Sequence, residues 1–296
     1  MKTLITGATG FIGSALTKHL TASGHEVVAL GRSRRDARGI VWDPETGQIE
    51  VEKLEGIDAA VHLAGESIAA GRWTAAKKAR LRNSRVKGTR LLSETLARMS
   101  RPPQVLVSAS AIGYYGDRGS EVLTEESPPG NGFLAGVCKQ WEAATEAATR
   151  KGIRVVHPRF GIVLARHGGA LGKMLLPFKL GVGGKIGSGH QYMSWITLDD
   201  LCAVLLHAIQ AGGLHGPVNA VAPNPVTNLE FTKTLGRVIS RPTIFPLPAF
   251  AARLALGEMA DELLLSSQRV EPAKLLGSRF GFKHKELEPA LTGILK

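Results

Sequence analysis

In the first 160 residues, short β-branched hydrophobic runs alternate with longer stretches in which hydrophobic residues recur at helical spacing. The short runs predict strands over Thr3–Thr6, Glu26–Leu30, Ile40–Trp42, Asp58–Gly65, Gln104–Ser110 and Ile153–Pro158. The longer stretches predict helices over Phe11–Leu20, Arg80–Met99 and Gly132–Lys151. Strands that alternate with helices form a parallel sheet with helices on both faces. The pattern therefore predicts an α/β fold with a doubly wound parallel sheet.

The pattern changes after residue 165. Residues 166–196 are rich in glycine and mix polar with aromatic residues, which predicts a mobile loop that contacts a substrate. A helix over Asp199–Ala211 and a strand over Val218–Val221 are predicted next. Thr227 and Glu230 have the spacing of a capping box, so we expect another helix to begin there.

Three glycines follow the first predicted strand, in the sequence KTLITGATGFIG that ends at Gly13. Gly7 permits a tight turn, Gly10 lets the backbone approach a pyrophosphate, and Gly13 lets the next helix pack against the strand. The free N–H groups at the start of that helix face the anion. The sequence therefore predicts a bound dinucleotide. Its predicted contacts in this turn are Gly7, Thr9, Gly10, Phe11, Ile12 and Gly13.

The end of the second predicted strand indicates which dinucleotide is bound. An acidic residue there holds a free ribose 2′-hydroxyl, whereas a 2′-phosphate needs a cation. Arg32, Ser33 and Arg34 follow this strand, and no carboxylate stands at the strand end. NADP is therefore favoured over NAD. The other predicted cofactor contacts lie near the ends of later strands and are Trp42, Leu63, Ala64, Gly65 and Arg159.

These signals divide the chain into two parts. We expect residues 1–165 to form a dinucleotide-binding Rossmann domain, whose sheet is completed by about residues 197–222. We expect residues 166–296 to form a smaller, mainly helical part that binds a substrate. Its last segment, residues 241–296, is punctuated by prolines and is predicted to form a helical lid.

Composition narrows the function classes. The chain has 296 residues and a net charge of +12, and ten basic residues lie between Arg72 and Arg101 against one acidic residue, Glu94. A basic stretch can bind nucleic acid or steer anions, but one with few aromatic residues is more often a solvated helix face. Two cysteines, Cys138 and Cys202, are too few for a disulfide framework or a metal site.

The sequence also predicts the cellular location and the binding partners. No apolar run is long enough to span a bilayer, and the first strand begins too early to leave room for a targeting peptide. We therefore expect a cytoplasmic protein that binds an unidentified small molecule and no metal or membrane, and binding to nucleic acid is disfavoured. An oligomer is compatible with the sequence.

Several motifs together resemble the extended short-chain dehydrogenase/reductases, the nucleotide-sugar epimerase and dehydratase group. They are GATGFIG, the strand ending HLAG, SAS at 108–110, Lys139 within a helix and WITLDD at 195–200. The segments AGESI, GYYG, KQWEAA and GGALGKMLLPF look like an epimerase-like subfamily sometimes labelled as cell-division inhibitor homologues. The resemblance implies a dinucleotide in the Rossmann half and a substrate pocket built by the C-terminal part.

The resemblance also implies roles for single residues. Ser110 matches the serine that hydrogen-bonds the reacting oxygen, and Lys139 matches the lysine that binds the nicotinamide ribose and lowers the pKa of a neighbouring phenol. The family's tyrosine stands four residues before that lysine, where this chain has Ala135. Proton transfer therefore needs a substitute. The candidates are Tyr115, which we favour, Tyr114 and Glu66.

The substrate side also departs from the family pattern. The resemblance implies an arginine that grips a nucleotide pyrophosphate, and Met193 stands in its place. A thioether cannot pair with phosphate, which counts against a nucleotide-sugar substrate. The predicted substrate contacts are Glu66, His190, Gln191 and Trp195.

Three hypotheses about function stay open. The first is an NADP-dependent oxidoreductase or epimerase-like enzyme that acts on an unidentified small molecule, as the retained Ser110 and Lys139 favour. The second is a non-catalytic NADP-binding protein, a redox sensor or interaction module, as Ala135 and Met193 favour. The third is a nucleic-acid-associated protein that uses residues 72–101, for which strongly salt-dependent binding is expected.

Overall fold

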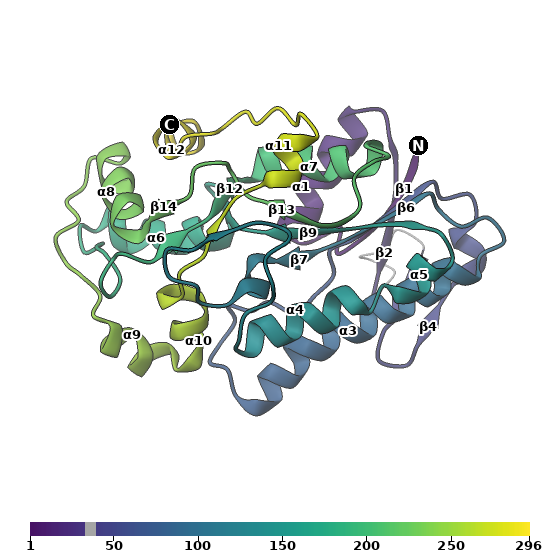
Figure 1. The fold of residues 1–296 in the computed structure, drawn as a ribbon, viewed down its shortest axis with the longest axis horizontal. Coiled ribbons are helices and arrows are strands. Elements are labelled where there is room, and N and C mark those ends of the chain that lie inside the picture. The colour runs from purple at the N-terminus through teal and green to yellow at the C-terminus, as the bar shows by residue number, and fades with distance from the viewer. Residues whose placement is uncertain (33–39) are drawn as a thin grey trace.

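The computed structural model describes residues 1–32 and 40–296, and a large, mainly parallel sheet forms its centre (Figure 1). The sheet order is β13-β9-β6-β5-β1-β2-β3-β4, and β7 also pairs with β9. These strands are β1 (Lys2–Thr6), β2 (Glu26–Gly31), β3 (Ile40–Asp43), β4 (Gln48–Ile49), β5 (Ala59–His62), β6 (Val105–Ser108), β7 (Ser110–Ala111), β9 (Arg154–Phe160) and β13 (Gly216–Ala220). Chain order reverses at β1, so the predicted doubly wound fold is confirmed.

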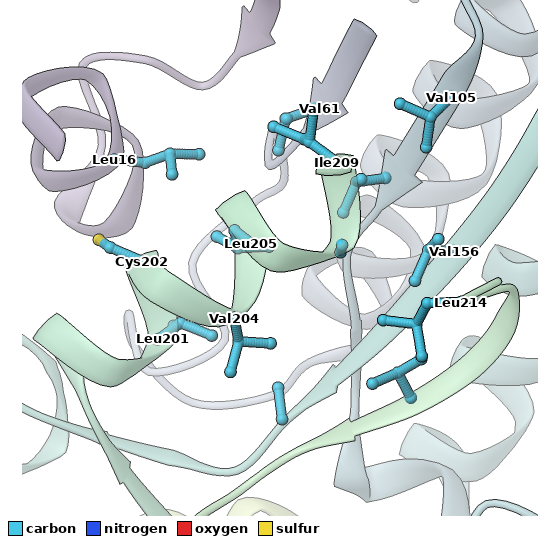
Figure 2. Close-up of a cluster of buried hydrophobic side chains, with 14 of the residues drawn as sticks. Leu16, Val61, Val105, Val156, Leu201, Cys202, Val204, Leu205, Ile209 and Leu214 are labelled. Carbon is cyan, nitrogen blue, oxygen red and sulfur yellow. The ribbon is translucent and has the colours of Figure 1, made fainter. Parts of the chain in front are cut away.

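Helices α1 (Phe11–Ala22) and α7 (Leu198–Gln210) cover one face of the sheet. Strand side chains alternate between faces, and every second residue of the central strands points to this layer. Val61, Val105 and Val156 are fully buried there, against Leu205 of α7 (Figure 2). The capping threonine of α7, Thr197, accepts a hydrogen bond from the N–H of Asp200.

The opposite face is covered by α3 (Ala75–Arg98), α4 (Phe133–Ala143) and α5 (Glu146–Arg150). The predicted single helix over 132–151 is thus two helices. Thr145 stands at the break, where its hydroxyl donates to the Glu142 carbonyl oxygen at 2.8 Å. A threonine side chain that bonds to the backbone in this way competes with the helical ladder, which accounts for the interruption.

The C-terminal part packs around a second core that contains Trp195. Helix α6 (Gly169–Lys179) contributes to it, so the prediction of a loop over 166–196 is wrong for these residues. Two positive-φ glycines at its start and Pro177 within it conceal the helix in the sequence. Thr227 and Glu230 do form the predicted capping box of α8 (Asn228–Val238).

Shorter elements complete the described chain. They are β8 (Val122–Leu123), β10 (Ile162–Leu164), β11 (Tyr192–Met193), β12 (Trp195–Thr197), β14 (Val226–Thr227), β15 (Arg269–Val270), α9 (Ala249–Leu256), α10 (Glu258–Ala260), α11 (Ala273–Gly277) and α12 (Leu287–Leu295). A 3-10 turn covers Ile112–Tyr115. Within the described ranges, no helix has both the length and the apolar character needed to cross a bilayer.

Candidate functional site

The strand, turn and helix at the N-terminus have the geometry that the glycine spacing predicts. Gly7 reverses the chain after β1 with φ = +69°, in the left-handed region. The Gly10 N–H donates to the Gly7 carbonyl oxygen at 3.0 Å, and α1 begins directly afterwards. A side chain at Gly13 would overlap the Gly7 carbonyl group. The first turn of α1 carries no acidic residue, so its N–H groups can face an anion.

The end of β5 lies beside this turn. The Thr6 hydroxyl accepts hydrogen bonds from the N–H groups of Leu63 and Ala64, at 3.1 and 3.2 Å. A side chain at Gly7 would lie 3.0 Å from the Ala64 nitrogen. The structure therefore brings Leu63 and Ala64, two of the predicted cofactor contacts, against the glycine turn.

Helix α6 also reaches the turn. The Phe11 ring packs on Gly168 and Gly169, whose φ values are +89° and +61°, and side chains at either glycine would collide with it. The Lys173 ammonium group donates to the Ala69 carbonyl oxygen at 2.8 Å, which ties α6 to the loop after β5. The start of α6 therefore flanks the glycine turn.

Cationic side chains gather around Glu66, just beyond β5. The Lys77 ammonium group lies 2.6 Å from the Glu66 carboxylate although Lys77 itself is buried, and Arg80 lies 3.9 Å away. The hydrogen bond from Lys77 lowers the pKa of Glu66, and the charges of Lys77, Arg80 and Arg32 add to the effect. Arg32 follows β2 and is exposed, whereas the predicted contacts Ser33 and Arg34 lie outside the described residues.

Trp42 was expected to flank an adenine, and the structure places it in the core instead. Its side chain is 3% exposed and packs against Gly88 of α3. Its ring meets the His62 ring edge to face, with 5.8 Å between the ring centroids. The prediction is wrong because β3 turns this ring toward α3.

A buried ion pair stands at the carboxyl ends of β7 and β9. The Arg159 guanidinium donates to both carboxylate oxygens of Glu142, from Nε at 2.8 Å and from Nη2 at 2.9 Å. The Ser110 hydroxyl donates to Oε1 of the same carboxylate at 2.7 Å. Ser110 is 1% exposed. Its hydrogen is thus directed to Glu142, and Arg159 is engaged within the protein rather than presented to a cofactor.

The two tyrosines after Ser110 have different surroundings. Tyr115 is fully buried, and its hydroxyl donates to Oδ1 of Asn219 at 2.7 Å and accepts from Arg159 at 2.9 Å. Burial raises the pKa of Tyr115 to about 12. Tyr114 is partly exposed, and the Arg159 guanidinium lies 3.5 Å from the centre of its ring. The preference for Tyr115 as the proton-transfer group is therefore wrong, because its hydroxyl is inaccessible and already bonded.

The face of α4 that meets Ser110 carries Cys138 and Glu142, four residues apart. Cys138 is 3% exposed and its thiol contacts the Ser110 hydroxyl, while burial raises the pKa of that thiol to about 12. Leu134, one turn earlier, packs against Gly113. Lys139 is exposed, and the neighbouring Cys138 contacts Ser110 instead. Leu134 and Cys138, four residues apart on this face of α4, offer neither a phenol nor an ammonium group.

The predicted substrate contacts lie in unlike environments. Trp195 is fully buried, and its indole N–H donates to the Asn224 carbonyl oxygen at 3.1 Å. The Gln191 amide donates to the carbonyl oxygens of Ile186 and Leu264, both at 3.0 Å. These two predictions are wrong, since both side chains hold the fold together. His190 is exposed and Glu66 is paired as described above.

Sequence reasoning missed Glu142 and Cys138. Glu142 is the single acidic residue of the otherwise mainly apolar segment FLAGVCKQWEA. This isolated charge is the signal that could have identified it. A carboxylate in such a helix needs a partner when the helix is buried. The register of that helix against Ser110 depends on tertiary packing and was not readable from the motif.

The sheet order and the glycine turn at its centre define a doubly wound Rossmann protein. The chain belongs to the NAD dependent epimerase/dehydratase family, whose model matches residues 3–220. A second model, a domain of unknown function named DUF1731, matches residues 247–294. The resemblance inferred from the motifs is therefore confirmed.

Similar proteins extend over the full chain. Epimerase family protein MT2273 of Mycobacterium tuberculosis is 44% identical over 288 residues, which cover 97% of this chain and 95% of the relative. Human epimerase family protein SDR39U1 is 39% identical over 298 residues and covers all of both chains. A crystal structure of human SDR39U1 (isoform2) with NADPH has a TM-score of 0.88 at 37% identity and covers 99% of each chain.

Proposed function

We propose that this chain is an NADP(H)-binding protein that holds the dinucleotide without the tyrosine-dependent proton transfer of its family. The Gly7–Gly13 turn and the open start of α1 would bind the pyrophosphate, and Arg32 would bind the 2′-phosphate. The human relative crystallised with NADPH supports this choice of cofactor. When bound, the nicotinamide ring supplies or accepts a hydride.

One observation carries the second half of the proposal. The helix face opposite Ser110 presents Leu134, Cys138 and Glu142, in place of a phenol and an ammonium group. The Ser110 hydroxyl donates to a carboxylate, so its remaining lone pairs can accept a hydrogen bond, but it has no hydrogen left to polarise a carbonyl oxygen. The residues of this chain would therefore position the dinucleotide and leave the reacting oxygen without a proton donor.

Cofactor titration tests the binding half. NADPH and NADH are titrated against the full chain, and NADPH is expected to bind about 5- to 150-fold more tightly, as charge-assisted contacts to one phosphate allow. Arg32→Ala removes most of this preference, whereas Arg98→Ala, at the far end of α3, leaves it unchanged. Equal affinities for the two cofactors contradict the assignment.

A turnover assay tests the second half. NADPH oxidation is followed with a broad panel of aldehydes and ketones, and no rate above the protein-free reaction is expected. Turnover with any of these carbonyls contradicts the proposed absence of catalysis. The cofactor assignment is tested separately, by the titration.

Tyr114 favours a second candidate function, an NADP-dependent oxidoreductase acting on a small carbonyl or alcohol. It is a phenol near Ser110 with exposed surface, and its ring lies on the Arg159 guanidinium. In this case Tyr114 would donate the proton to the substrate oxygen. Turnover in the panel would then fall by about 10²- to 10⁴-fold in Tyr114→Phe. Unchanged turnover in that variant excludes Tyr114 as the donor.

A further inference from the structure

Helices α6, α8 and α9 lie together at one end of the molecule (Figure 1). Large apolar side chains are exposed there: Leu176 of α6 and Leu180 directly after it at 66% and 69%, and Phe250 and Leu254 of α9 at 72% and 78%. Each pair is spaced four residues apart and so lies on one side of its helix. We call the exposed set the apolar patch, and its members are Leu176, Leu180, Val182, Ile244, Phe245, Leu247, Phe250 and Leu254.

The two segments that build the apolar patch run beside each other. The Leu247 N–H donates to the Lys185 carbonyl oxygen at 2.8 Å, and Arg241 Nε donates to the Lys179 carbonyl oxygen at 3.0 Å. Gly184 packs against the Phe245 backbone so closely that a side chain could not fit. These contacts hold the two segments together, so their exposed apolar side chains are grouped in one region rather than scattered singly.

The two segments that build the patch carry basic residues and no acidic ones. Residues 166–198 and 231–257 contain no acidic residue. Their basic residues are Arg166, Lys173, Lys179, Lys185, Lys233, Arg237, Arg241 and Arg253. An open cavity of about 500 Å³ lies next to the patch, lined by Lys233, Arg237, Arg241 and small or neutral residues. Arg237 and Arg253 have exposed ion pairs with Glu288 and Asp261, which contribute little when a stronger anion competes.

We propose that the apolar patch and this basic cavity dock the protein on the surface of an anionic lipid bilayer. The Phe250 and Leu254 side chains would enter the boundary between headgroups and acyl chains, and Lys233 and Arg241 would meet lipid phosphates. A second copy of this chain fits the surface poorly, because each copy carries a net charge of +12. Docking of this kind needs no spanning helix, and it replaces our expectation of no membrane contact.

Vesicle co-sedimentation of the full chain tests the proposal. One set of vesicles is phosphatidylcholine alone, and the other is an equimolar mixture with phosphatidylglycerol. We expect at least about tenfold stronger partitioning onto the mixed vesicles, falling as salt is added. Equal partitioning onto both, or none onto either, overturns the proposal.

Variants in the apolar patch and in the basic cavity test which side chains contact the bilayer. The double variant Phe250→Ser/Leu254→Ser is expected to reduce partitioning at least about tenfold, through lost apolar burial. Lys233→Ala and Arg241→Ala each reduce it about fivefold. Leu276→Ser, which changes a side chain 51% exposed outside the patch, is the matched control and leaves partitioning unchanged. Circular dichroism and NADPH titration confirm that each variant is folded.

Two other outcomes overturn the proposal and identify the occupant instead. Tight binding to polyglutamate with no binding to vesicles assigns the surface to an acidic protein. A dimer in solution that Phe250→Ser/Leu254→Ser dissociates assigns it to a second copy of this chain. Both measurements are independent of cofactor binding, so they do not depend on the proposed function.

Discussion

The glycine turn after β1 and the Ser110 centre, formed by Ser110 of β7, Glu142 of α4 and Arg159 of β9, both stand at the same edge of the parallel sheet, but they keep the family pattern to different degrees. The turn depends on backbone: the φ of Gly7 and the contact between Gly13 and Gly7 leave little freedom. The centre depends on side chains, and there the face of α4 toward Ser110 presents Leu134 and Cys138 rather than a phenol and an ammonium group. Side-chain chemistry can be replaced without disturbing a fold, whereas a backbone contact of this kind cannot.

The largest expected effect is in the Ser110 centre. Glu142→Ala leaves the Arg159 guanidinium buried without its carboxylate and is expected to lower the free energy of unfolding by about 3 to 5 kcal/mol. Ser110→Ala keeps that ion pair and serves as the control, with a loss of about 1 kcal/mol. Urea denaturation measures both. A smaller loss for Glu142→Ala than for Ser110→Ala contradicts the role assigned to the ion pair.

Gly10→Val tests whether the glycine turn binds the pyrophosphate. A Cβ at Gly10 meets only the Gly7 carbonyl oxygen, at 3.2 Å, so the fold is expected to survive. The larger side chain occupies the place of the pyrophosphate, and NADPH affinity falls by about 100-fold or more. Gly136→Val, at a helical glycine with free space around it, controls for the loss of glycine. Normal NADPH binding by a folded Gly10→Val protein would falsify the site.

Lower pH is expected to weaken both regions through two histidines, His62, which is fully buried, and His157, which is partly buried. Burial, assisted by Arg85, lowers the pKa of His62 to about 4, and burial also lowers the pKa of His157, beside the Ser110 centre, to about 4. In the unfolded chain each histidine takes up a proton near pH 6.5, whereas in the folded chain it stays neutral down to about pH 4. Its contribution to the free energy of unfolding is therefore fully present above pH 6.5 and is lost as the pH falls from 6.5 to 4. At pH 5 each histidine costs about 2 kcal/mol relative to neutral pH.

Urea denaturation at pH 7 and pH 5 measures this loss. The His62→Gln and His157→Gln variants lose less stability than the parent between the two pH values, because each lacks one proton-binding group. If one variant keeps the full pH dependence, the histidine that it removes does not contribute.

The two tyrosines give a smaller effect. Tyr115→Phe removes a hydroxyl bonded to Arg159 and Asn219 and is expected to cost about 1.5 kcal/mol of unfolding free energy. Tyr114→Phe keeps the ring on Arg159 and is expected to change stability by less than about 0.5 kcal/mol. Thermal denaturation of both variants compares them, and the reverse order would show that the buried network has been misassigned.

The smallest expected effect is at Lys139. Its side chain is exposed, so Lys139→Ala is expected to change the free energy of unfolding by less than about 0.5 kcal/mol and to leave NADPH affinity unchanged. Isothermal titration of the variant measures the affinity. A loss of about tenfold or more in affinity restores the lysine that the family resemblance implies.

What the sequence predicted well was local. The β1 strand, the turn at Gly7 and the capping box at Thr227 are determined by neighbouring residues, and the structure has them as predicted. Trp42 and Trp195 were misread, because whether an aromatic side chain faces a ligand or the core depends on how its strand packs. Cys138 rather than the neighbouring Lys139 contacts Ser110, since one residue of helix rotates a side chain by about 100°.

The late position of β13 and α7 in the chain has a consequence for biosynthesis. Val105 and Val156 belong to strands complete by residue 160, but α7, which packs over them, ends at Gln210 (Figure 2). A ribosome adds about 5 to 20 residues per second, so the part of this sheet face under α7 stays uncovered for about 2 to 10 s during synthesis, while α1 is already made. A nascent chain is most open to chaperones and to aggregation in that interval.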